Sequence, residues 1–311
     1  MIELIVSSIS IVVSRFQVSR VRTQKQMHRS FASLRMTGLT SVLVAFALVN
    51  GNLSAAHAQV SIAQISDTHL GEKRAPHAAD NLRRAVEMIN ARHPDAIILS
   101  GDIGETPRDW REAKQILSAI KAPLYYVPGN HDVHTHDVQQ YRAEFGKDYY
   151  RFQVKGVNFV VIDSQLLGNY EQYEAKSPPP LPPDTQAESD EMLRWLEKQA
   201  NESARPPAIT IGVQHIPVFR DDEFPNDSKP YWVVSDPYRS REMDLLHKLG
   251  IKHMLVGHWH SGRVFNADGI TWHVAPATSW LPWGGELGFA MHTISPDGNV
   301  TTEFVPLGTE P

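Results

Sequence analysis

The sequence contains no cysteine among its 311 residues. The protein therefore forms no disulfide bond, binds no metal through thiolates and uses no cysteine nucleophile. The absence is compatible with an oxidising compartment but does not determine one. With 41% hydrophobic and 21% charged residues, the composition is that of a globular protein. It is large enough for one large domain or two small ones.

The sequence also lacks an apolar run long enough for a convincing membrane span. Its best candidate extends from about Leu39 to Val49, after a basic residue, Arg35, and before Ala56-His57-Ala58. This order of basic residue, apolar core and A-x-A pattern is typical of a secretory signal peptide. We predict cleavage after Ala58 and export to the periplasm or the medium. An uncleaved anchor helix is the alternative.

The residues before this signal have no helix caps and no clear period. We interpret them as a spurious extension, with Met36 favoured as the true start, so that residues 1–58 are extension plus signal peptide. Residues 1–58 hold six Lys or Arg and one Glu, which leaves 24 basic and 34 acidic residues in 59–311, a formal charge of −10. Such a surface disfavours nucleic acid and anionic membranes as partners.

Apolar runs and helical spacings alternate through the first half of the mature chain. The predicted strands are 60–66, 95–100 and 123–128, and the predicted helices between them are 77–92 and 106–120. This alternation is typical of a parallel sheet covered by helices. Residues 149–164 then predict a hairpin around Lys155-Gly156.

The second half repeats the alternation and ends in β-rich sequence. It predicts helices at 185–202 and 238–249, strands at 208–215 and 251–258, and two strand-turn-strand units with turns at 267–269 and 296–298. We find no internal repeat and no linker. The prediction is one α/β domain over 59–311, with two sheets packed together and helices outside.

The run Gly257-His258-Trp259-His260 follows a predicted strand. On an extended backbone, side chains two residues apart point the same way, so both imidazoles would leave on one side and Trp259 on the other. Imidazole is the commonest protein metal ligand. A pair of hydrogen-bonded histidines is the alternative, and the choice depends on whether other strands supply matching ligands.

Polar residues of the ligand type follow five predicted strands. They are Asp67 and His69, then Asp102, then Asn130 with His131, then His215, and finally His258 with His260. Ligands of α/β sheets bind beyond the carboxyl ends of strands, so these residues are predicted to converge. A helix cap, a turn or a hydrogen-bonded histidine would explain any one of these clusters alone. Five such clusters, each after a predicted strand, favour a common site.

Carboxylates, imidazoles and one amide, without sulfur, favour Zn, Fe, Mn, Co or Ni over a structural thiolate zinc. The ligands are too many for one tetrahedral ion and fit two ions that share a carboxylate. Such pairs, about 3.5–4 Å apart, hold both oxygens of an in-line displacement. We predict two divalent or trivalent transition-metal ions, Mn, Fe or Zn.

The order D-x-H, G-D, G-N-H-D, H, G-H-x-H resembles that of the calcineurin-like metallophosphoesterase superfamily and spans almost all of 59–311. The stretches "YRAEFGKDYYRFQVKGVNFVVIDSQ" and "QHIPVF" are similar to the single-domain serine/threonine phosphatase branch. Single-domain cyclic-nucleotide phosphodiesterases share the same motifs. The resemblance implies a four-layer α/β/β/α sandwich.

The resemblance also implies a role for each motif residue. One metal would bind Asp67, His69 and His260, the other Asn130, His215 and His258, with Asp102 as the bridge. A metal-bridging hydroxide is then the expected nucleophile, because metal binding lowers the pKa of water from 15.7 to about 7. His131 is the predicted general acid or charge stabiliser, worth about 10²–10⁴-fold. The side chain that orients His131 is expected to be Asp132 or Glu105. Some members of the superfamily carry Asp at the position of Glu105.

Two loops are predicted to contribute to substrate binding. Residues 218–237 form a long polar and aromatic loop after His215, and loops of this kind are often functional. We predict substrate contacts from Arg220, Tyr231 and Trp232, and a stacking surface from Trp280 or Trp283 on a facing rim formed by residues 278–288. Packing of the aromatic side chains is the alternative.

We therefore predict an exported dinuclear-metal phosphomonoesterase for a small phosphoester, with no nucleic-acid partner and no stable membrane span in the mature form. The first alternative is a phosphodiesterase for cyclic nucleotides or glycerophosphodiesters on the same site. The second is a secreted metal-binding protein without turnover, against which the complete ligand set and His131 argue. The sequence leaves the physiological substrate, the metals and the oligomeric state open.

Overall fold

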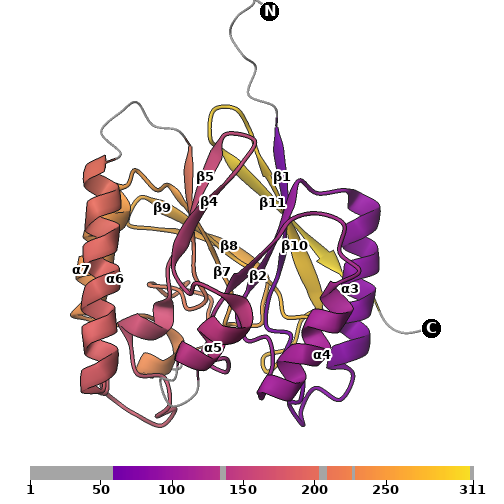
Figure 1. Ribbon diagram of the computed structural model, residues 1–311, viewed down its shortest axis with the longest axis horizontal. Helices are drawn as coiled ribbons and strands as arrows, with labels where there is room; N and C mark the ends of the chain where they lie inside the picture. Colours follow the sequence, from indigo (N-terminus) through magenta and orange to yellow (C-terminus); the bar gives the residue numbers. More distant parts are fainter. Residues whose placement is uncertain (1–58, 134–137, 203–208, 226–227, 309–311) are drawn as a thin grey trace, which may run out of the picture. The chain divides into compact units, whose positions relative to one another are not determined.

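The structure is a computed structural model that describes residues 59–133, 138–202, 209–225 and 228–308 (Figure 1). The predicted extension, signal peptide and cleavage site in 1–58 lie outside the described residues, so export stays a prediction. From Gln59 onward the described chain belongs to one compact unit. None of the helices described combines the length and apolar character that crossing a bilayer requires.

The first of two sheets has the strand order β11-β10-β1-β2-β3. Its strands are β1 (Val60–Ile65), β2 (Ala96–Ser100), β3 (Leu124–Val127), β10 (Gly288–Ile294) and β11 (Val300–Pro306). β1, β2 and β3 are parallel, and β10 runs antiparallel to both of its neighbours. The carboxyl ends of three parallel strands therefore lie side by side.

The second sheet has the order β4-β5-β6-β7-β9-β8. Its strands are β4 (Tyr150–Val154), β5 (Val157–Val161), β6 (Thr210–Val213), β7 (His253–Val256), β8 (Arg263–Ala267) and β9 (Ile270–Val274). The four inner strands are parallel and the two edge strands antiparallel. Both edge hairpins turn through two residues with positive φ, Lys155-Gly156 and Asp268-Gly269, which matches the twist of the paired strands.

Helices cover the outer face of each sheet (Figure 1). The elements are α3 (Ala78–Arg92), α4 (Pro107–Leu117), α5 (Val138–Phe145), α6 (Pro183–Glu202) and α7 (Tyr238–Lys248), with short 3₁₀ turns η3 (Ser164–Leu167) and η4 (Pro230–Trp232). Local sequence sets the helix ends. Thr106 caps α4 by accepting from Asp109 N, and Pro107 occupies the first turn, where no N–H is needed. His93 ends α3 in a left-handed conformation.

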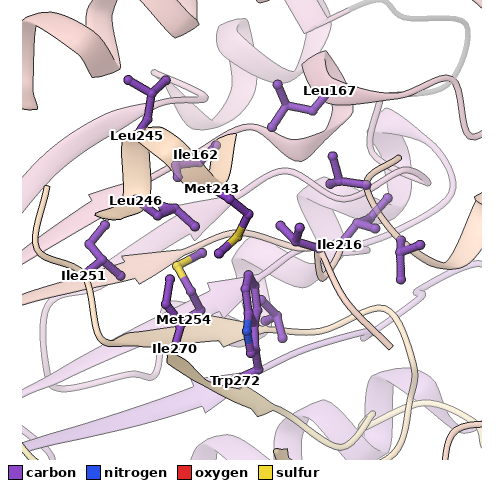
Figure 2. Close-up of a cluster of buried hydrophobic side chains, with 14 of the residues drawn as sticks. Ile162, Leu167, Ile216, Met243, Leu245, Leu246, Ile251, Met254, Ile270 and Trp272 are labelled. Atoms are coloured by element: carbon purple, nitrogen blue, oxygen red, sulfur yellow. The ribbon is translucent and has the colours of Figure 1, made fainter. Parts of the chain in front are cut away.

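Three apolar clusters separate four layers. The first lies between α3, α4, α5 and the first sheet, the second between the two sheets, and the third between the second sheet and α6 and α7. Figure 2 shows the third, where Met243 and Leu246 of α7 meet Met254 and Trp272. Neighbouring residues of β2 alternate between clusters, because Ile97 faces the helices and Ile98 the other sheet. The predicted four-layer α/β/β/α sandwich is confirmed.

Every predicted strand and helix within the described residues is present, with ends displaced by a few residues. The helix α5 has no counterpart among the predictions. It has only eight residues and buries two of them, Val138 and Tyr141, so its apolar period is too short to recognise.

Candidate metal centre

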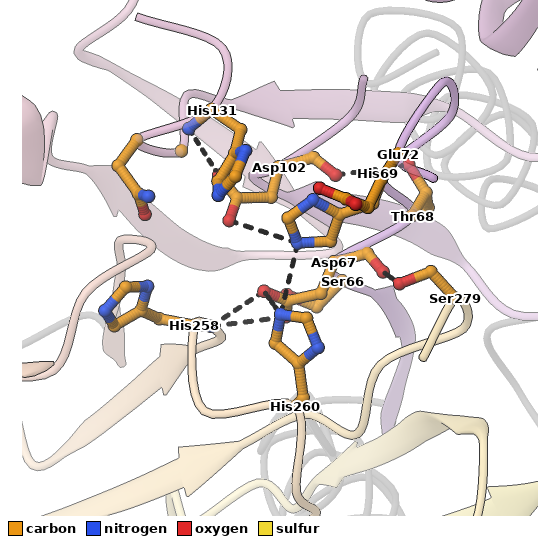
Figure 3. Close-up of polar contacts among 12 residues, drawn as sticks. Ser66, Asp67, Thr68, His69, Glu72, Asp102, His131, His258, His260 and Ser279 are labelled. Atoms are coloured by element: carbon orange, nitrogen blue, oxygen red, sulfur yellow. Dashed lines mark hydrogen bonds and ion pairs between the residues drawn. The ribbon is translucent and has the colours of Figure 1, made fainter. Parts of the chain in front are cut away.

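Five loops from both sheets meet beyond the carboxyl ends of β1, β2, β3, β6 and β7 (Figure 3). Backbone hydrogen bonds tie these loops together: Asp67 N donates to Gly101 O at 3.1 Å, and Gly257 N donates to His215 O at 2.8 Å. All seven predicted ligands are at least nine-tenths buried. The convergence expected from the sequence is therefore present, and it joins residues almost two hundred positions apart.

A first cluster consists of Asp67, His69, Asp102 and His260, each of which offers one ligand atom within 4.8 Å of the others. His69 Nε2 lies 3.4 Å from Asp102 Oδ2, and His260 Nε2 lies 3.3 Å from Asp67 Oδ1. The two imidazole nitrogens are 3.1 Å apart. Four donor atoms at these distances have the composition and spacing of a site for one transition-metal ion.

A second cluster shares Asp102 and adds His215 and His258. His215 Nε2 lies 3.2 Å from Asp102 Oδ2 but makes no hydrogen bond. His258 Nδ1 and Asn130 Oδ1 are likewise buried without a hydrogen-bond partner. Buried polar atoms are normally paired, and these three are the atoms through which the predicted second metal would be bound. The residues therefore fit a second cation.

A hydrogen bond at the other ring nitrogen fixes each of the four imidazoles. His215 Nδ1 donates to Ser100 O, His260 Nδ1 to Trp280 O, His258 Nε2 to Tyr231 O, and His69 Nδ1 to Glu105. In the neutral form of each ring this nitrogen carries the proton, and the other then presents a lone pair to the centre. The acceptors thus select the tautomer that binds a metal.

The backbone at the centre adopts a conformation that non-glycine residues rarely take. Asp67, His69, Asp102, His258 and His260 all have φ between 43° and 71°. Such positions cost on the order of 1–3 kcal/mol each and mark functional sites. The predicted extended geometry of His258 to His260 is wrong, since β7 ends at Val256. Both rings nevertheless reach the centre because His258 and His260 each adopt the left-handed conformation themselves, while Trp259 is fully buried in the apolar core.

Two glycines allow the loops to approach this closely. A Cβ at Gly129 would collide with the backbone N and the carboxylate of Asp102, and a Cβ at Gly257 would collide with Ser66 Oγ. The glycines before Asn130 and His258 are therefore needed for space rather than for a positive φ.

Burial and charge act on the carboxylates in opposite directions. Burial disfavours ionisation of Asp102, but the imidazoles of His215, His131 and His69 outweigh it and hold its pKa well below the usual range. Burial raises the pKa of Asp67. Burial also lowers the pKa of His260 to about 4 and that of His258 well below its ordinary value, so both rings are neutral at pH 7, the form that binds metals.

His131 lies beside the two clusters. Its backbone N donates to Asp102 Oδ1 at 2.9 Å, and its ring Nδ1 lies 2.9 Å from Glu105 Oε2. The other oxygen of Glu105 holds His69, so one carboxylate orients both rings. Asp132, the other partner considered, instead accepts from the backbone N–H groups of Gly129 and Ile103 and fixes the loop.

The predicted substrate residues have different surroundings. Tyr231 Oη accepts a hydrogen bond from Asn130 Nδ2 at 3.0 Å, so it reaches the centre. Trp280 packs against the ring of His260, with centroids 4.9 Å apart. Trp232 is buried in the apolar core, and Arg220 donates to Lys229 O, which braces the loop that carries Tyr231. Contact of these four with a substrate stays a prediction.

Sequence reasoning missed the residues that act through backbone atoms or from outside the motifs. The carbonyl groups of Ser100, Tyr231 and Trp280 fix imidazoles without any side-chain signal. Arg74, on the loop after β1, stacks on Trp280 with 4.1 Å between its Cζ and the ring centroid. Its closeness to the Asp67 motif was the only signal that could have drawn attention to it.

Comparison with known proteins identifies a family and several relatives. The sequence model of the calcineurin-like phosphoesterases matches residues 60–262. The serine/threonine-protein phosphatase CPPED1 of Danio rerio is 27% identical over 247 residues, which cover 74% of each chain, and the mouse protein of that name is 31% identical over 57% of each chain. The probable glycerophosphodiester phosphodiesterase GpdQ of Arcobacter nitrofigilis is 27% identical over 50% of this chain and 60% of its own.

Among solved structures, a dimetal phosphatase from Danio rerio superposes with a TM-score of 0.63 at 15% identity. The superposition covers 80% of this chain and 96% of that one. At this identity the likeness concerns the fold, and it agrees with the four layers described above.

Proposed function

The chain belongs to the calcineurin-like phosphoesterase family, and we propose that it is an exported phosphomonoesterase with a centre of two transition-metal ions. It is a hydrolase of phosphoric esters, as the relatives are by name. The observation that carries the proposal is the pair of buried ligand clusters joined by Asp102, with a histidine outside both sets held next to them.

In this proposal Asp67, His69 and His260 hold one ion, Asn130, His215 and His258 hold the other, and Asp102 is shared. When bound, the ions would supply a water of lowered pKa as nucleophile and would neutralise charge on the phosphate oxygens. The protein supplies oriented donor atoms in a buried setting, where fixed hydrogen bonds keep each ring in place. Support for two ions comes from the three unpaired atoms Asn130 Oδ1, His215 Nε2 and His258 Nδ1.

His131 is proposed to give a proton to the leaving alkoxide. Glu105 holds its Nδ1, so Nε2 is the nitrogen that faces a substrate and carries the transferable proton. Burial disfavours the charged ring, but Asp102 and Glu105 raise the pKa of His131 to about 9. Tyr231 Oη accepts from Asn130 and keeps its own O–H for a phosphate oxygen.

The monoester preference is supported by the CPPED1 relatives, which match more of this chain than the GpdQ relatives do. The GpdQ relatives favour the second candidate, a phosphodiesterase on the same site. The purified protein, reconstituted separately with Mn, Zn and Fe, distinguishes them with p-nitrophenyl phosphate and its bis ester. We expect the higher kcat/KM for the monoester. A clear preference for the bis ester contradicts the proposal, and inertness of metal-loaded protein towards both favours a non-catalytic role.

Export is proposed from the order of residues between Arg35 and Ala58. N-terminal sequencing of the protein recovered from outside the cytoplasm is expected to begin at Gln59. Full-length protein retained with the cells would contradict both cleavage and export.

A further inference from the structure

Arg74 is a cation fixed in one orientation on the loop between β1 and α3. Its Nε donates to Glu72 Oε1 and its Nη2 to Glu72 Oε2, both at 3.0 Å. Its guanidinium lies over the Trp280 ring, 4.1 Å from the centroid. Two parallel hydrogen bonds to one carboxylate, together with stacking on an aromatic ring, restrict the arginine side chain far more than a simple surface ion pair does.

This arginine lies beside the metal centre. Glu72 N donates to His69 O at 3.1 Å, which ties the loop to a predicted ligand (Figure 3). The Trp280 ring below Arg74 packs against His260, and Trp280 O fixes His260 Nδ1. The bond to Glu72 raises the pKa of Arg74, and the charges of Tyr231 and Glu105 act in the same direction. Arg74 is therefore at the rim of the proposed active site, on the Trp280 side.

One edge of the guanidinium remains available. Glu72 occupies the edge formed by Nε and Nη2, and within the described part of the chain Nη1 has no hydrogen-bond partner. The edge formed by Nη1 and the second hydrogen of Nη2 has the spacing that binds a carboxylate through two parallel bonds. The side chain of Arg74 is 57% exposed, so a ligand has access to this edge.

The ion pair with Glu72 does not by itself account for the arrangement. Glu72 is largely covered, but the Arg74 end of the pair is exposed, and an ion pair open to water at one end contributes little to stability and needs no aromatic support. Arginine bonding lowers the pKa of Glu72 to about 2, so the acid is charged at neutral pH and the pair is neutral as a whole. No cation other than Arg74 is bonded to Glu72 in the described residues, so the free edge offers a ligand two N–H donors of a guanidinium rather than a net positive charge.

We propose that Arg74, supported by Glu72 and Trp280, binds a carboxylate on the leaving group of the substrate. The inference rests on the proposed function and names its substrate class: small phosphomonoesters of carboxylate-bearing alcohols, such as phosphorylated hydroxy acids or amino acids. Arg74 stays outside the metal ligands and sets specificity through the part of the substrate that does not react.

Binding of non-hydrolysable phosphonates tests this without relying on turnover. Isothermal titration of the metal-reconstituted protein compares benzylphosphonate with 4-carboxybenzylphosphonate, which differ only in the carboxylate. We expect the carboxylate probe to bind the wild type about tenfold more tightly, since a charge-assisted bidentate pair is worth about that much in affinity. Arg74→Gln should bring the two dissociation constants together, and Arg74→Lys should keep part of the difference because it keeps charge without the fork.

Arg83→Gln is the matched control. Arg83 is also an exposed arginine paired with a carboxylate, Asp80, but it lies on α3 away from the centre, and its side chain is 51% exposed against 57% for Arg74. The Arg83→Gln variant should keep the wild-type ratio of the two phosphonate dissociation constants. Equal affinities for both probes in the wild type, or an unchanged ratio in Arg74→Gln, would overturn the inference.

Turnover of phenyl phosphate and 4-carboxyphenyl phosphate separates the two proposals. Hydrolysis of both without advantage for the carboxylate would sink the specificity role of Arg74 and leave the phosphomonoesterase standing. Failure to hydrolyse either, with the phosphonate ratio intact, would end the phosphomonoesterase proposal and keep the carboxylate site.

Discussion

Asp102 is the residue on which the centre depends most. Its Oδ2 lies 3.4 Å from His69 Nε2 and 3.2 Å from His215 Nε2, so it belongs to both ligand clusters. Its Oδ1 accepts the backbone N–H of His131 at 2.9 Å. A single carboxylate thus joins the two proposed metal positions and places the proposed acid, which explains why its unusual backbone conformation is tolerated.

Replacing Asp102 by Asn should therefore abolish metal binding and activity together. The amide keeps the size of the side chain but removes the charge that binds two cations. Losing even an outer partner of a ligand costs about 10–100-fold in metal affinity, so losing the shared ligand should exceed 100-fold. Elemental analysis beside kinetics measures both, with exposed Asp80→Asn as control. An Asp102→Asn protein that keeps two ions would contradict the bridging role.

His131→Ala should separate metal binding from activity. The ring is bonded to Glu105 and is not one of the proposed ligands, so the metal content should stay at the wild-type level. We expect kcat to fall about 10²–10⁴-fold, the usual worth of a general acid. The loss should shrink for substrates with acidic leaving groups, which need no proton. A fully active variant, or equal losses for all leaving groups, would refute proton donation by His131.

At the scale of elements, the sequence predicted where the strands end but not how the chain continues from them. Apolar runs located β1, β2 and β7, and the polar residues that follow them were predicted to be ligands. The left-handed turns at Asp67 and His258 depend on contacts between loops of different sheets, such as the bonds from His258 N to the Asp67 carboxylate. No local pattern records such contacts, which is also why the backbone acceptors and Arg74 went unnoticed.

Helix α7 carries a buried acid whose effect on stability depends on pH. Burial raises the pKa of Glu242 to about 8, with Gln214 acting in the opposite direction. The folded protein therefore keeps a proton that the unfolded chain releases near its ordinary pKa of 4.5. The contribution of Glu242 to the free energy of unfolding should fall as pH rises from 4.5 to 8 and level off above it.

Glu242→Gln removes this dependence because the amide has the shape of the protonated acid and no charge. We expect the variant to match the wild type near pH 5 and to exceed it at pH 9, by on the order of a few kcal/mol. Urea unfolding at both pH values measures the difference. A variant that is equally destabilised at pH 5 and pH 9 would show that Glu242 is charged in the folded state.

At the scale of the whole described domain, a mostly buried polar chain connects the two sheets. His253 Nδ1 lies 3.1 Å from His273 Nε2, and Thr302 Oγ1 lies within 2.9 Å of Nδ1 of both His273 and His292. His292 Nε2 then bonds to Gln64, whose amide donates to Ser100 Oγ at 2.7 Å. The carbonyl of Ser100 fixes His215, a proposed ligand, so the contact between the sheets continues into the centre.

Acid should weaken this contact between the sheets. Burial lowers the pKa of His273 to about 3 and that of His292 well below its ordinary value, so both rings fold in the neutral form. The unfolded chain takes up protons below pH 6.5, and each histidine should therefore cost about 2 kcal/mol of stability between pH 7 and pH 5.

The double variant His273→Gln, His292→Gln should lose less stability over that interval than the wild type, whatever its stability at pH 7. Urea unfolding at the two pH values gives the double difference, and His247→Gln, on α7 and outside the polar chain, is the control for exchanging a histidine for glutamine. Equal acid losses in the wild type and the double variant would mean that the inter-sheet histidines take up protons as readily in the folded protein as in the unfolded chain, and the polar chain would then not be the acid-sensitive contact.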